Sequence, residues 1–279
     1  APAPRISLPM TLALRGLTMA LLLALAAITF TPLVWLLAAA LKAPEDLFSY
    51  TFFSPNPSLK NFYDLFTQVD FLRFVANSVF VSCAGVVIQL FFSSLAGFAL
   101  AKYEFRGKRA ITLLMLATLL IPGQVTLAPT YELIYRMGLV DTYAGLLIPG
   151  AVSVFGIFLF RQAMLSVPTE LIHAARIDGC SEFQIYWQVV IPTVRPMIGA
   201  FVLIAFMGQW NSFLWPQIIL HSAERFTLPI ALTQMVGIYQ QQYGMLMAGT
   251  LLSILPVMAL FLFLQREFVA GLTAGAVKG

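Results

Sequence analysis

The chain has 279 residues, of which 60% are hydrophobic and only 10% are charged, and its formal net charge at pH 7 is +4. An ordinary soluble domain carries roughly 25% charged residues, so this composition excludes a typical soluble enzyme and indicates a membrane protein. The small positive charge does not indicate nucleic-acid binding, which requires a basic folded face.

Six long apolar segments follow one another along the chain. Each has the length that a helix needs to cross the roughly 30 Å hydrocarbon core of a bilayer. The segments are continuous rather than alternating, which favours helices over barrel strands. We therefore predict an all-α, polytopic membrane protein that forms a single transmembrane domain over residues 1–279. The predicted spans are 17–41, 75–101, 110–131, 140–160, 196–220 and 245–265.

The first apolar segment must be distinguished from a signal peptide, because Arg5 and Arg15 precede it. It is about 25 residues long, beyond a typical signal-peptide core, and it continues through Pro32 and Trp35 without a small-residue cleavage site. We therefore expect it to be a retained span.

The segments between the spans differ in charge, and the cytoplasmic loops of membrane proteins carry an excess of Lys and Arg. With the N-terminus placed inside, eleven of the 16 Lys and Arg residues fall inside, and the strongest anchor is the cluster at 102–109. We therefore predict that both termini and the polar segment 161–195 are cytoplasmic. The inside cations are Arg5, Arg15, Lys102, Arg106, Lys108, Arg109, Arg161, Arg176, Arg195, Arg266 and Lys278, and the outside ones are Lys42, Lys60, Arg73, Arg136 and Arg225.

The ionisable side chains that intramembrane chemistry requires are missing from the predicted spans. A charge at the bilayer centre costs roughly 2.5–3.5 kcal/mol, so it is kept there only for function. His173 and His221 fall on opposite sides of the membrane, which argues against a proton relay or a shared metal. Cys83 lies in the second span, where we expect it to pack, and Cys180 lies in the polar segment, so no disulfide is expected.

The sequence also contains no Gly-x-x-x-x-Gly-Lys-Ser/Thr loop that could hold a nucleotide phosphate. We therefore predict that the chain is not an enzyme and carries no catalytic residue, metal or cofactor. If it moves a solute uphill, the energy must come from a partner.

The polar segment 161–195 reads as a helix, a turn and a second helix. Pro168 suits a first helical position, and the charge of Glu170 suits a helix N-terminus. Gly179 is predicted to end this helix, because glycine tolerates a positive φ. One helix face carries small residues that would let another protein approach closely. Its members are Leu171, Ala174, Ala175 and Asp178.

The second helix of the polar segment is predicted from Ser181 and Gln184, which have the spacing of a capping box. Pro192 is expected to end it, and Pro196 to open the next span. An alternative left open by the pattern is an ordinary interfacial loop whose aromatic side chains rest among lipid headgroups. The aromatic and apolar residues of this helix are Phe183, Tyr186, Trp187 and Val190.

The polar segment resembles the coupling loop of ABC importer permeases, whose signature is Glu-Ala-Ala, three residues, Gly, nine residues, then Ile-x-Leu-Pro. Ala174-Ala175, Gly179 and Pro192 stand at the matching spacing, with Val189 and Ile191 as conservative replacements. His173 departs from the pattern, since the family has its first Glu there. Glu170, one helical turn earlier, is the candidate to take over its contact.

Two further stretches resemble the carbohydrate branch of that family. Residues 208–216, Gly-Gln-Trp-Asn-Ser-Phe-Leu-Trp-Pro, look like its fifth-span motif. Residues 265–279 look like the tail of the shorter, six-span permease of maltose/trehalose-type importers. With six spans and similar loop lengths, the likeness covers nearly the whole chain.

The resemblance implies partners and contact residues. Such a permease pairs with a second permease, here expected to be a different chain. Two ATPase subunits bind ATP and Mg²⁺, and an extracytoplasmic binding protein delivers the solute in a bacterial or archaeal inner membrane. Expected ATPase contacts are Glu170, Leu171, His173, Ala174, Ala175, Arg176, Asp178 and Gly179 in the coupling loop, and Gly271, Thr273, Gly275 and Lys278 in the tail.

Solute contacts are predicted from amides and indoles, which hydrogen-bond sugar hydroxyls and stack on sugar rings without carrying charge. Each of these side chains could instead serve in packing between helices, at about 0.6 kcal/mol for a hydrogen bond. The loop 239–243 matches in position one that contacts the binding protein. Pathway candidates are Asn77, Gln89, Gln124, Gln209, Trp210, Asn211 and Trp215, and binding-protein candidates are Tyr239, Gln240, Gln241 and Gln242.

We therefore expect the permease subunit of an ATP-driven importer for a carbohydrate, such as an oligosaccharide, a trehalose- or maltose-like sugar or an amino sugar. The same architecture could import glycerol 3-phosphate or a glycerophosphodiester, but an anionic solute would favour a cation facing the pathway. A channel or an intramembrane enzyme is the alternative from another class. An enzyme would need convergent ionisable groups, and a channel would not need a docking helix.

Overall fold

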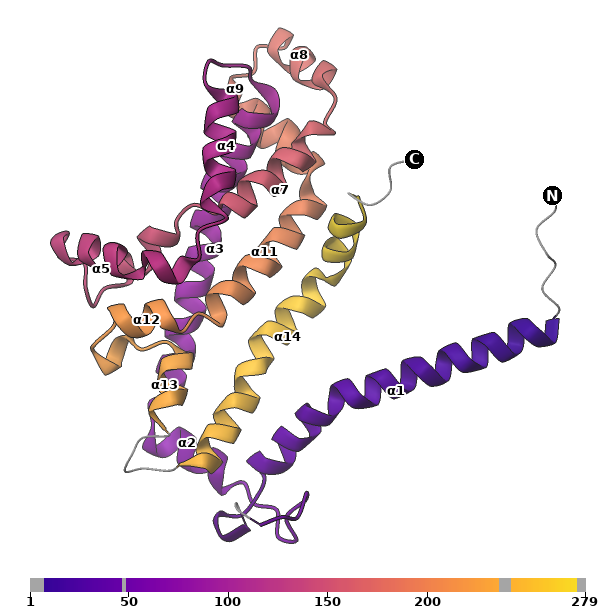
Figure 1. Cartoon of the computed structure of the whole chain (residues 1–279), viewed down its shortest axis with the longest axis vertical. Helices are drawn as coiled ribbons and strands as arrows, with labels where there is room; N and C mark the ends of the chain where they lie inside the picture. The colour runs from indigo at the N-terminus through magenta and orange to yellow at the C-terminus, as the bar shows by residue number, and fades with distance from the viewer. Residues whose placement is uncertain (1–7, 47–48, 236–241, 275–279) are drawn as a thin grey trace. The chain divides into compact units, whose positions relative to one another are not determined.

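The structure is a computed structural model that describes residues 8–46, 49–235 and 242–274. These residues form helices and connecting turns without any strand, which confirms the predicted all-α class (Figure 1). They divide into two compact units, one from residues 1–70 and 235–252 and one from residues 71–234 and 253–279.

The first unit contains α1 (Leu8–Ala40), η1 (Pro44–Asp46), α2 (Lys60–Gln68) and the beginning of α14 (Tyr243–Ala274). The buried amide of Asn61 on α2 donates one hydrogen bond to the carbonyl of Ala40 and one to that of Lys42, each at 2.9 Å. These bonds satisfy carbonyls that the end of α1 leaves unpaired. They fix α2 against the C-terminal end of α1.

The second unit is built around α3 (Phe71–Lys102), a helix about 48 Å long at 1.5 Å per residue. It packs against α7 (Val154–Leu165) and α11 (Arg195–Trp210). At Gly97 a Cβ atom would lie only 2.7 Å from Cβ of Phe160, so glycine is needed for the close approach of α3 and α7. The remaining helices of this unit are α4 (Lys108–Thr118), η2 (Gly123–Thr126), α5 (Leu127–Arg136), α6 (Tyr143–Leu147), η3 (Ile148–Gly150), α8 (Thr169–Ile177), α9 (Glu182–Gln184), η4 (Ile185–Val190), α10 (Ile191–Thr193), α12 (Leu214–Ile219), η5 (Ala223–Arg225), α13 (Leu228–Gln234) and α14 from Ser253 onward.

Helices cover each of the six predicted spans, but only α1, α3 and α14 are continuous and long enough to cross a bilayer. The predicted span 110–131 bends by 96° between α4 and η2–α5, and 140–160 bends by 48° before α7. The helix predicted over 196–220 ends at Trp210. A bend of 84° separates this helix, α11, from the preceding α9–α10 segment. At this end the carbonyl of Met207 accepts from both the backbone N–H and the side-chain amide of Asn211.

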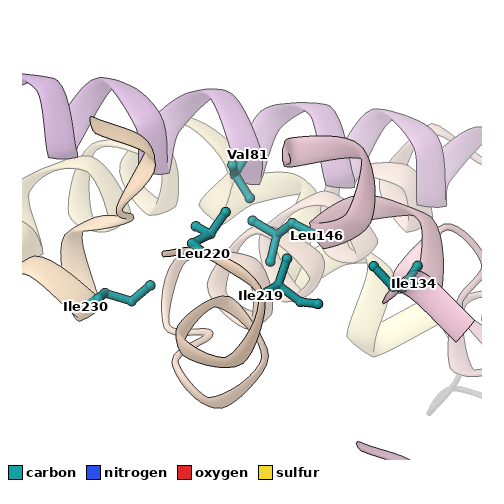
Figure 2. Packing of buried hydrophobic residues seen from close by; sticks show 6 residues of the cluster. All are labelled: Val81, Ile134, Leu146, Ile219, Leu220 and Ile230. Atoms are coloured by element: carbon teal, nitrogen blue, oxygen red, sulfur yellow. The ribbon is translucent and has the colours of Figure 1, made fainter. Parts of the chain in front are cut away.

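A cluster of buried aliphatic side chains packs beside α3 in the second unit (Figure 2). The cluster joins α3 to the short helices α5, α6, α12 and α13. Nearby, the carboxylate of Asp141 accepts hydrogen bonds from the backbone N–H groups of His221 and Ser222, at 2.9 and 3.0 Å. The members of the cluster are Val81, Ile134, Leu146, Ile219, Leu220 and Ile230.

The two ends of α3 differ in the cations beside them. At its C-terminal end, Lys102 donates to the carbonyl of Val167, and the loop that follows carries Arg106, Lys108 and Arg109. At its N-terminal end lie two cations, Arg73 in the first turn of α3 and Arg225 in the loop whose carbonyls, at Glu224 and Phe226, accept from Asn77. Of these cations, those predicted to be inside and those predicted to be outside therefore lie at opposite ends of α3.

Cys83 was predicted to pack in the second span, but its side chain is exposed on α3 in the single chain. Periodicity cannot distinguish a helix face that is covered by the same chain from one that faces lipid or another subunit.

Candidate functional site

The first arm of the polar segment is the helix α8. It begins at Thr169, and Pro168 precedes it with φ −59° and ψ 135° instead of occupying the first helical position as predicted. Ile172 and Ala175 are buried, at 2% and 8% exposure, so Ala175 does not lie on an open docking face as predicted. It lies on the side of the helix that packs on its own chain. The exposed residues of α8 and its C-terminal cap are Thr169, Glu170, Leu171, His173, Ala174, Arg176, Ile177 and Asp178.

The turn after α8 has the predicted geometry. Gly179 has φ +83°, its N–H donates to the carbonyl of Arg176, and the N–H of Cys180 donates to the carbonyl of Ala175. These two bonds form a Schellman motif, the common C-terminal cap that places glycine in the left-handed region. No atom lies within 4 Å of where a Cβ of Gly179 would be, so the requirement for glycine is conformational and not steric.

The second arm starts with the predicted capping box. The Ser181 side chain accepts from the backbone N–H of Gln184, and the Gln184 side chain accepts from the backbone N–H of Ser181. The helix then continues as the π-helical turn η4 and the short α10, ending at Thr193, one residue beyond Pro192. Tyr186 and Val190 of this arm are buried. π-Helical turns are frequent at functional sites.

Both arms are tied to each other and to α3 by polar contacts. The Arg176 guanidinium donates two hydrogen bonds to the Glu182 carboxylate, at 2.7 and 3.2 Å, and the Tyr103 hydroxyl donates to the same carboxylate. The hydrogen bonds from Arg176 and from Tyr103 hold the pKa of Glu182 below its usual value. Deeper in the unit, the buried hydroxyls of Tyr186 and Ser94 lie 2.7 Å apart. These contacts connect both arms of the polar segment 161–195 to α3.

Sequence reasoning missed these partners on α3. Tyr103 follows the last residue of α3 and lies 79 positions before Glu182, and no local pattern signals such a contact. Arg176, predicted as a contact for another subunit, is exposed, and its guanidinium also bonds to Glu182 within this chain.

The predicted C-terminal tail begins as a helix. α14 continues to Ala274, beyond the span end predicted at 265, and packs on α11. A Cβ at Gly199 would lie 2.4 Å from Cβ of Glu267, and one at Gly271 would lie 2.8 Å from the carbonyl oxygen of Pro196. Gly271 is therefore buried against α11. Thr273 lies in the last turn of α14, and Gly275 and Lys278 lie outside the described residues.

Most of the predicted pathway residues bond to main-chain carbonyls of the same chain. Trp210 is 4% exposed and donates to the carbonyl of Ser253, and Trp215 donates to that of Leu146. Asn77 holds the loop at η5, as described above, and Asn211 bonds to Met207. A cavity of about 180 Å³ lies beside Trp210 and Asn211. In the single chain, these four side chains organise the structure.

The amides of Gln89 and Gln209 both lie beside Gly150. Gln89 donates to the carbonyl of Gly150 at 2.8 Å. A Cβ at Gly150 would lie 3.7 Å from Nε2 of Gln89 and 3.9 Å from Nε2 of Gln209. Both amides are partly exposed and converge on the break between η3 and α7. They form a pair of hydrogen-bonding groups from two long helices, which we call the glutamine pair.

The remaining candidates lie elsewhere. Gln124 is exposed on η2, and the backbone N–H of Gln242 donates to the carbonyl of Met235. Tyr239, Gln240 and Gln241 lie outside the described residues. Among the residues that the structure describes, no three His, Cys, Asp or Glu side chains lie close enough together to hold a metal ion.

Comparison with known proteins gives one family. The family described as "Binding-protein-dependent transport system inner membrane component" matches residues 89–272. An arabinooligosaccharide transport system permease protein of Halalkalibacterium halodurans is 38% identical over 91% of this chain and 93% of its own length. An sn-glycerol-3-phosphate transport system permease protein of Agrobacterium fabrum is 34% identical over 72% of each chain.

A solved structure agrees on the fold. A chain of a bacterial ABC transporter involved in the import of the acidic polysaccharide alginate superposes with a TM-score of 0.83, at 23% identity, over 95% of this chain and 100% of its own. The arrangement of helices described above is therefore one that a transporter subunit adopts.

Proposed function

Because the chain belongs to the family of binding-protein-dependent transport system inner membrane components, we propose that it is a permease subunit that forms half of the pathway of an ABC importer for an oligosaccharide. As a non-catalytic membrane subunit, it takes its energy from ATP that separate ATPase subunits bind with Mg²⁺. Its other partners are a solute-binding protein and a second permease chain, and the tail of the shorter permease favours a heterodimer.

The choice of a carbohydrate rests on the relatives and on the chemistry of the spans. Relatives that cover most of the chain are named for arabinooligosaccharide, lactose and maltodextrin transport. The relative named for sn-glycerol 3-phosphate keeps the anionic alternative open. An anionic solute would favour a cation facing the pathway, and none of the predicted spans holds one at mid-membrane depth. Uncharged amides such as the glutamine pair suit hydroxyl groups.

Membrane orientation follows from the two ends of α3. The end beside the polar segment carries Lys102, Arg106, Lys108 and Arg109, which supports a cytoplasmic location for this end and for both termini. The opposite end, with the loop of Arg225, then faces the binding protein. The loop 239–242, which lies outside the described residues except for Gln242, is predicted on the outer side from the order of the spans alone.

The coupling role rests on one observation: α8 presents an exposed face while its turn is fixed by Gly179 and tied to α3 through Glu182. A cytoplasmic ATPase that binds the exposed residues of α8 can move the helix as a rigid body. The bonds of Tyr103 and Tyr186 pass that movement to α3, which carries Gln89. Rigid-body coupling of this kind needs a contact that differs between two states, and a docked helix supplies one.

The test is reconstitution of the complete importer in proteoliposomes. Uptake of labelled arabinotriose, lactose, maltotriose and glycerol 3-phosphate is measured with and without ATP and the binding protein. We expect uptake of one of the sugars that requires both components. Conductance by the purified chain alone without ATP would contradict the importer role, and uptake of glycerol 3-phosphate in place of a sugar would contradict the solute class.

A further inference from the structure

An open cavity of about 860 Å³ lies at the start of α4. Three cations line it: Lys108 and Arg109 from the first turn of α4, and Arg161 from α7. Glu104 is the only acidic residue in its lining. The cavity is separate from the glutamine pair and from the exposed face of α8.

Two of the three cations lack a counter-charge. Lys108 is neutralised, because its Nζ lies 2.7 Å from Oε1 of Glu104 and donates to the carbonyl of Tyr103 at 3.0 Å. Arg109 and Arg161 form no ion pair with any residue that the structure describes. Nε of Arg161 is buried and has no hydrogen-bond partner among these residues. The charges of Arg109 and Arg161 are therefore not compensated within the described part of the chain, so this side of the cavity favours an anion.

The backbone adds to this preference. α4 has eleven residues, and its N-cap, Gly107, has no side chain that could accept a hydrogen bond from the first turn. The first residues of α4 line the cavity, so the positive end of the helix dipole lies beside it, although the N–H of Lys108 already donates to the carbonyl of Phe105. Phosphate groups bind readily at such helix ends when cations accompany them.

The rest of the lining is apolar and points to a lipid. Phe105 and Leu113 line the cavity and are 41% and 57% exposed. Leu113 lies more than one turn beyond Arg109, inside the predicted span 110–131. The cavity therefore offers cations at the membrane surface and apolar side chains on the bilayer side, which matches a headgroup attached to acyl chains. A soluble anion would contact only the cations and not the apolar side chains.

We propose that this cavity binds the phosphate headgroup of an anionic phospholipid, phosphatidylglycerol or cardiolipin, through Arg109 and Arg161. Basic pockets between helices on the cytoplasmic side of a membrane are suited to such headgroups. The assignment rests on the proposed orientation for the choice of leaflet, but it is independent of the transported solute. A lipid seated here joins α4 to α7, directly before the coupling loop.

The test uses the assembled importer in detergent, with lipid occupancy measured by native mass spectrometry after addition of phosphatidylglycerol, cardiolipin or phosphatidylcholine. We expect retained anionic lipid on the wild type, and about fivefold lower occupancy for Arg161→Gln, the factor for one lost cation near an anionic surface. The matched control is Arg106→Gln, because Arg106 is an exposed cation of the same loop that does not line the cavity. Arg109→Gln, at an exposed position, gives a second variant whose folding is not at risk.

Other outcomes would overturn the proposal. Equal occupancy in Arg161→Gln, Arg109→Gln and Arg106→Gln would show that the cavity does not select the headgroup. Complete displacement of the lipid by inorganic phosphate or glycerol 3-phosphate would identify a soluble-anion site. A photo-crosslinker at position 109 that captures a partner subunit and no lipid would show that a protein covers the cavity. Because the readout is lipid occupancy, failure of sugar uptake would not affect it.

Discussion

The guanidinium of Arg176 and the carboxylate of Glu182 face each other across the turn at Gly179, with two hydrogen bonds between them. This pair closes the two arms of the coupling loop into one body. Both side chains are about half exposed, so the pair contributes only about 0–1 kcal/mol to folding stability. The importance of the pair is that it fixes the position of one arm relative to the other.

Glu182→Gln should therefore leave folding unchanged and weaken coupling. Without the carboxylate, α8 can move relative to α9 and to Tyr103, so solute-stimulated ATP hydrolysis should fall while basal hydrolysis stays. The matched control is Glu132→Gln, because Glu132 pairs with Arg136 at the same 2.7 Å but within the single helix α5. Equal losses in the two variants would contradict a special role for the pair.

Gly179→Val should assemble with its partners but lose solute-stimulated hydrolysis and uptake. A β-branched residue at φ +83° costs on the order of 1–3 kcal/mol of local strain, which misplaces α8 without unfolding the packed helices. Gly179→Asn is the control, since asparagine tolerates the left-handed region and the site has free space. If Gly179→Val transports at the wild-type rate, the segment is only an interfacial turn.

His173→Glu should retain full uptake, because it restores the residue of the family motif at an exposed position of α8. His173 is the middle residue of the nine-residue helix, beyond its first turn, so the added charge has little effect on helix stability through the dipole. Uptake and ATPase stimulation by the reconstituted importer are the measurements. A large loss in either would mean that the cognate ATPase surface has adapted to histidine.

Gly85→Ala tests the glutamine pair without changing its chemistry. A Cβ at Gly85 would lie 2.9 Å from Nε2 of Gln209, so the flexible amide must move away. Loss of one hydrogen bond of about 0.5–1.5 kcal/mol should lower uptake about two- to tenfold, with assembly and basal hydrolysis intact. Gly150→Ala is the control, because its nearest amide atom lies 3.7 Å away, at ordinary contact distance. Unchanged uptake in Gly85→Ala would remove Gln209 from the pathway.

Orientation is tested by single cysteines at positions 60, 106 and 176 in a chain with Cys83→Ser and Cys180→Ser. All three positions are exposed in the structure, so reactivity reports the side of the membrane and not burial. An impermeant maleimide added to intact cells should label position 60 and leave 106 and 176 unlabelled. Labelling at 176 from outside would separate the coupling loop from any cytoplasmic ATPase.

The parts of this molecule that sequence could predict are those fixed by neighbouring residues. Gly179 and the capping box of Ser181 and Gln184 act within a few positions, so the end of one helix and the start of the next were predicted correctly. Pro168 was placed one position too far inside α8, which is the usual uncertainty at a helix end.

The parts that it could not predict depend on contacts between distant segments. Ala175 was assigned to an open face because spacing shows which residues share a helix side, but not what that side packs against. The bond from Tyr103 to Glu182 and the position of Gln89 and Gln209 beside Gly150 depend on how α3 crosses the later helices. Hydropathy detected the span 110–131 but not its 96° bend, because the bend leaves the apolar composition unchanged.

That bend also limits what can surround the chain. Every residue from 119 to 126 is exposed, and the segment leaves the regular helix in which each backbone group has a partner. Hydrocarbon cannot solvate free peptide groups, so an irregular segment at membrane depth must be covered by protein or must line water. We therefore infer that the segment at this bend, which includes Gln124, is covered by another subunit or lines the aqueous pathway, and does not face lipid.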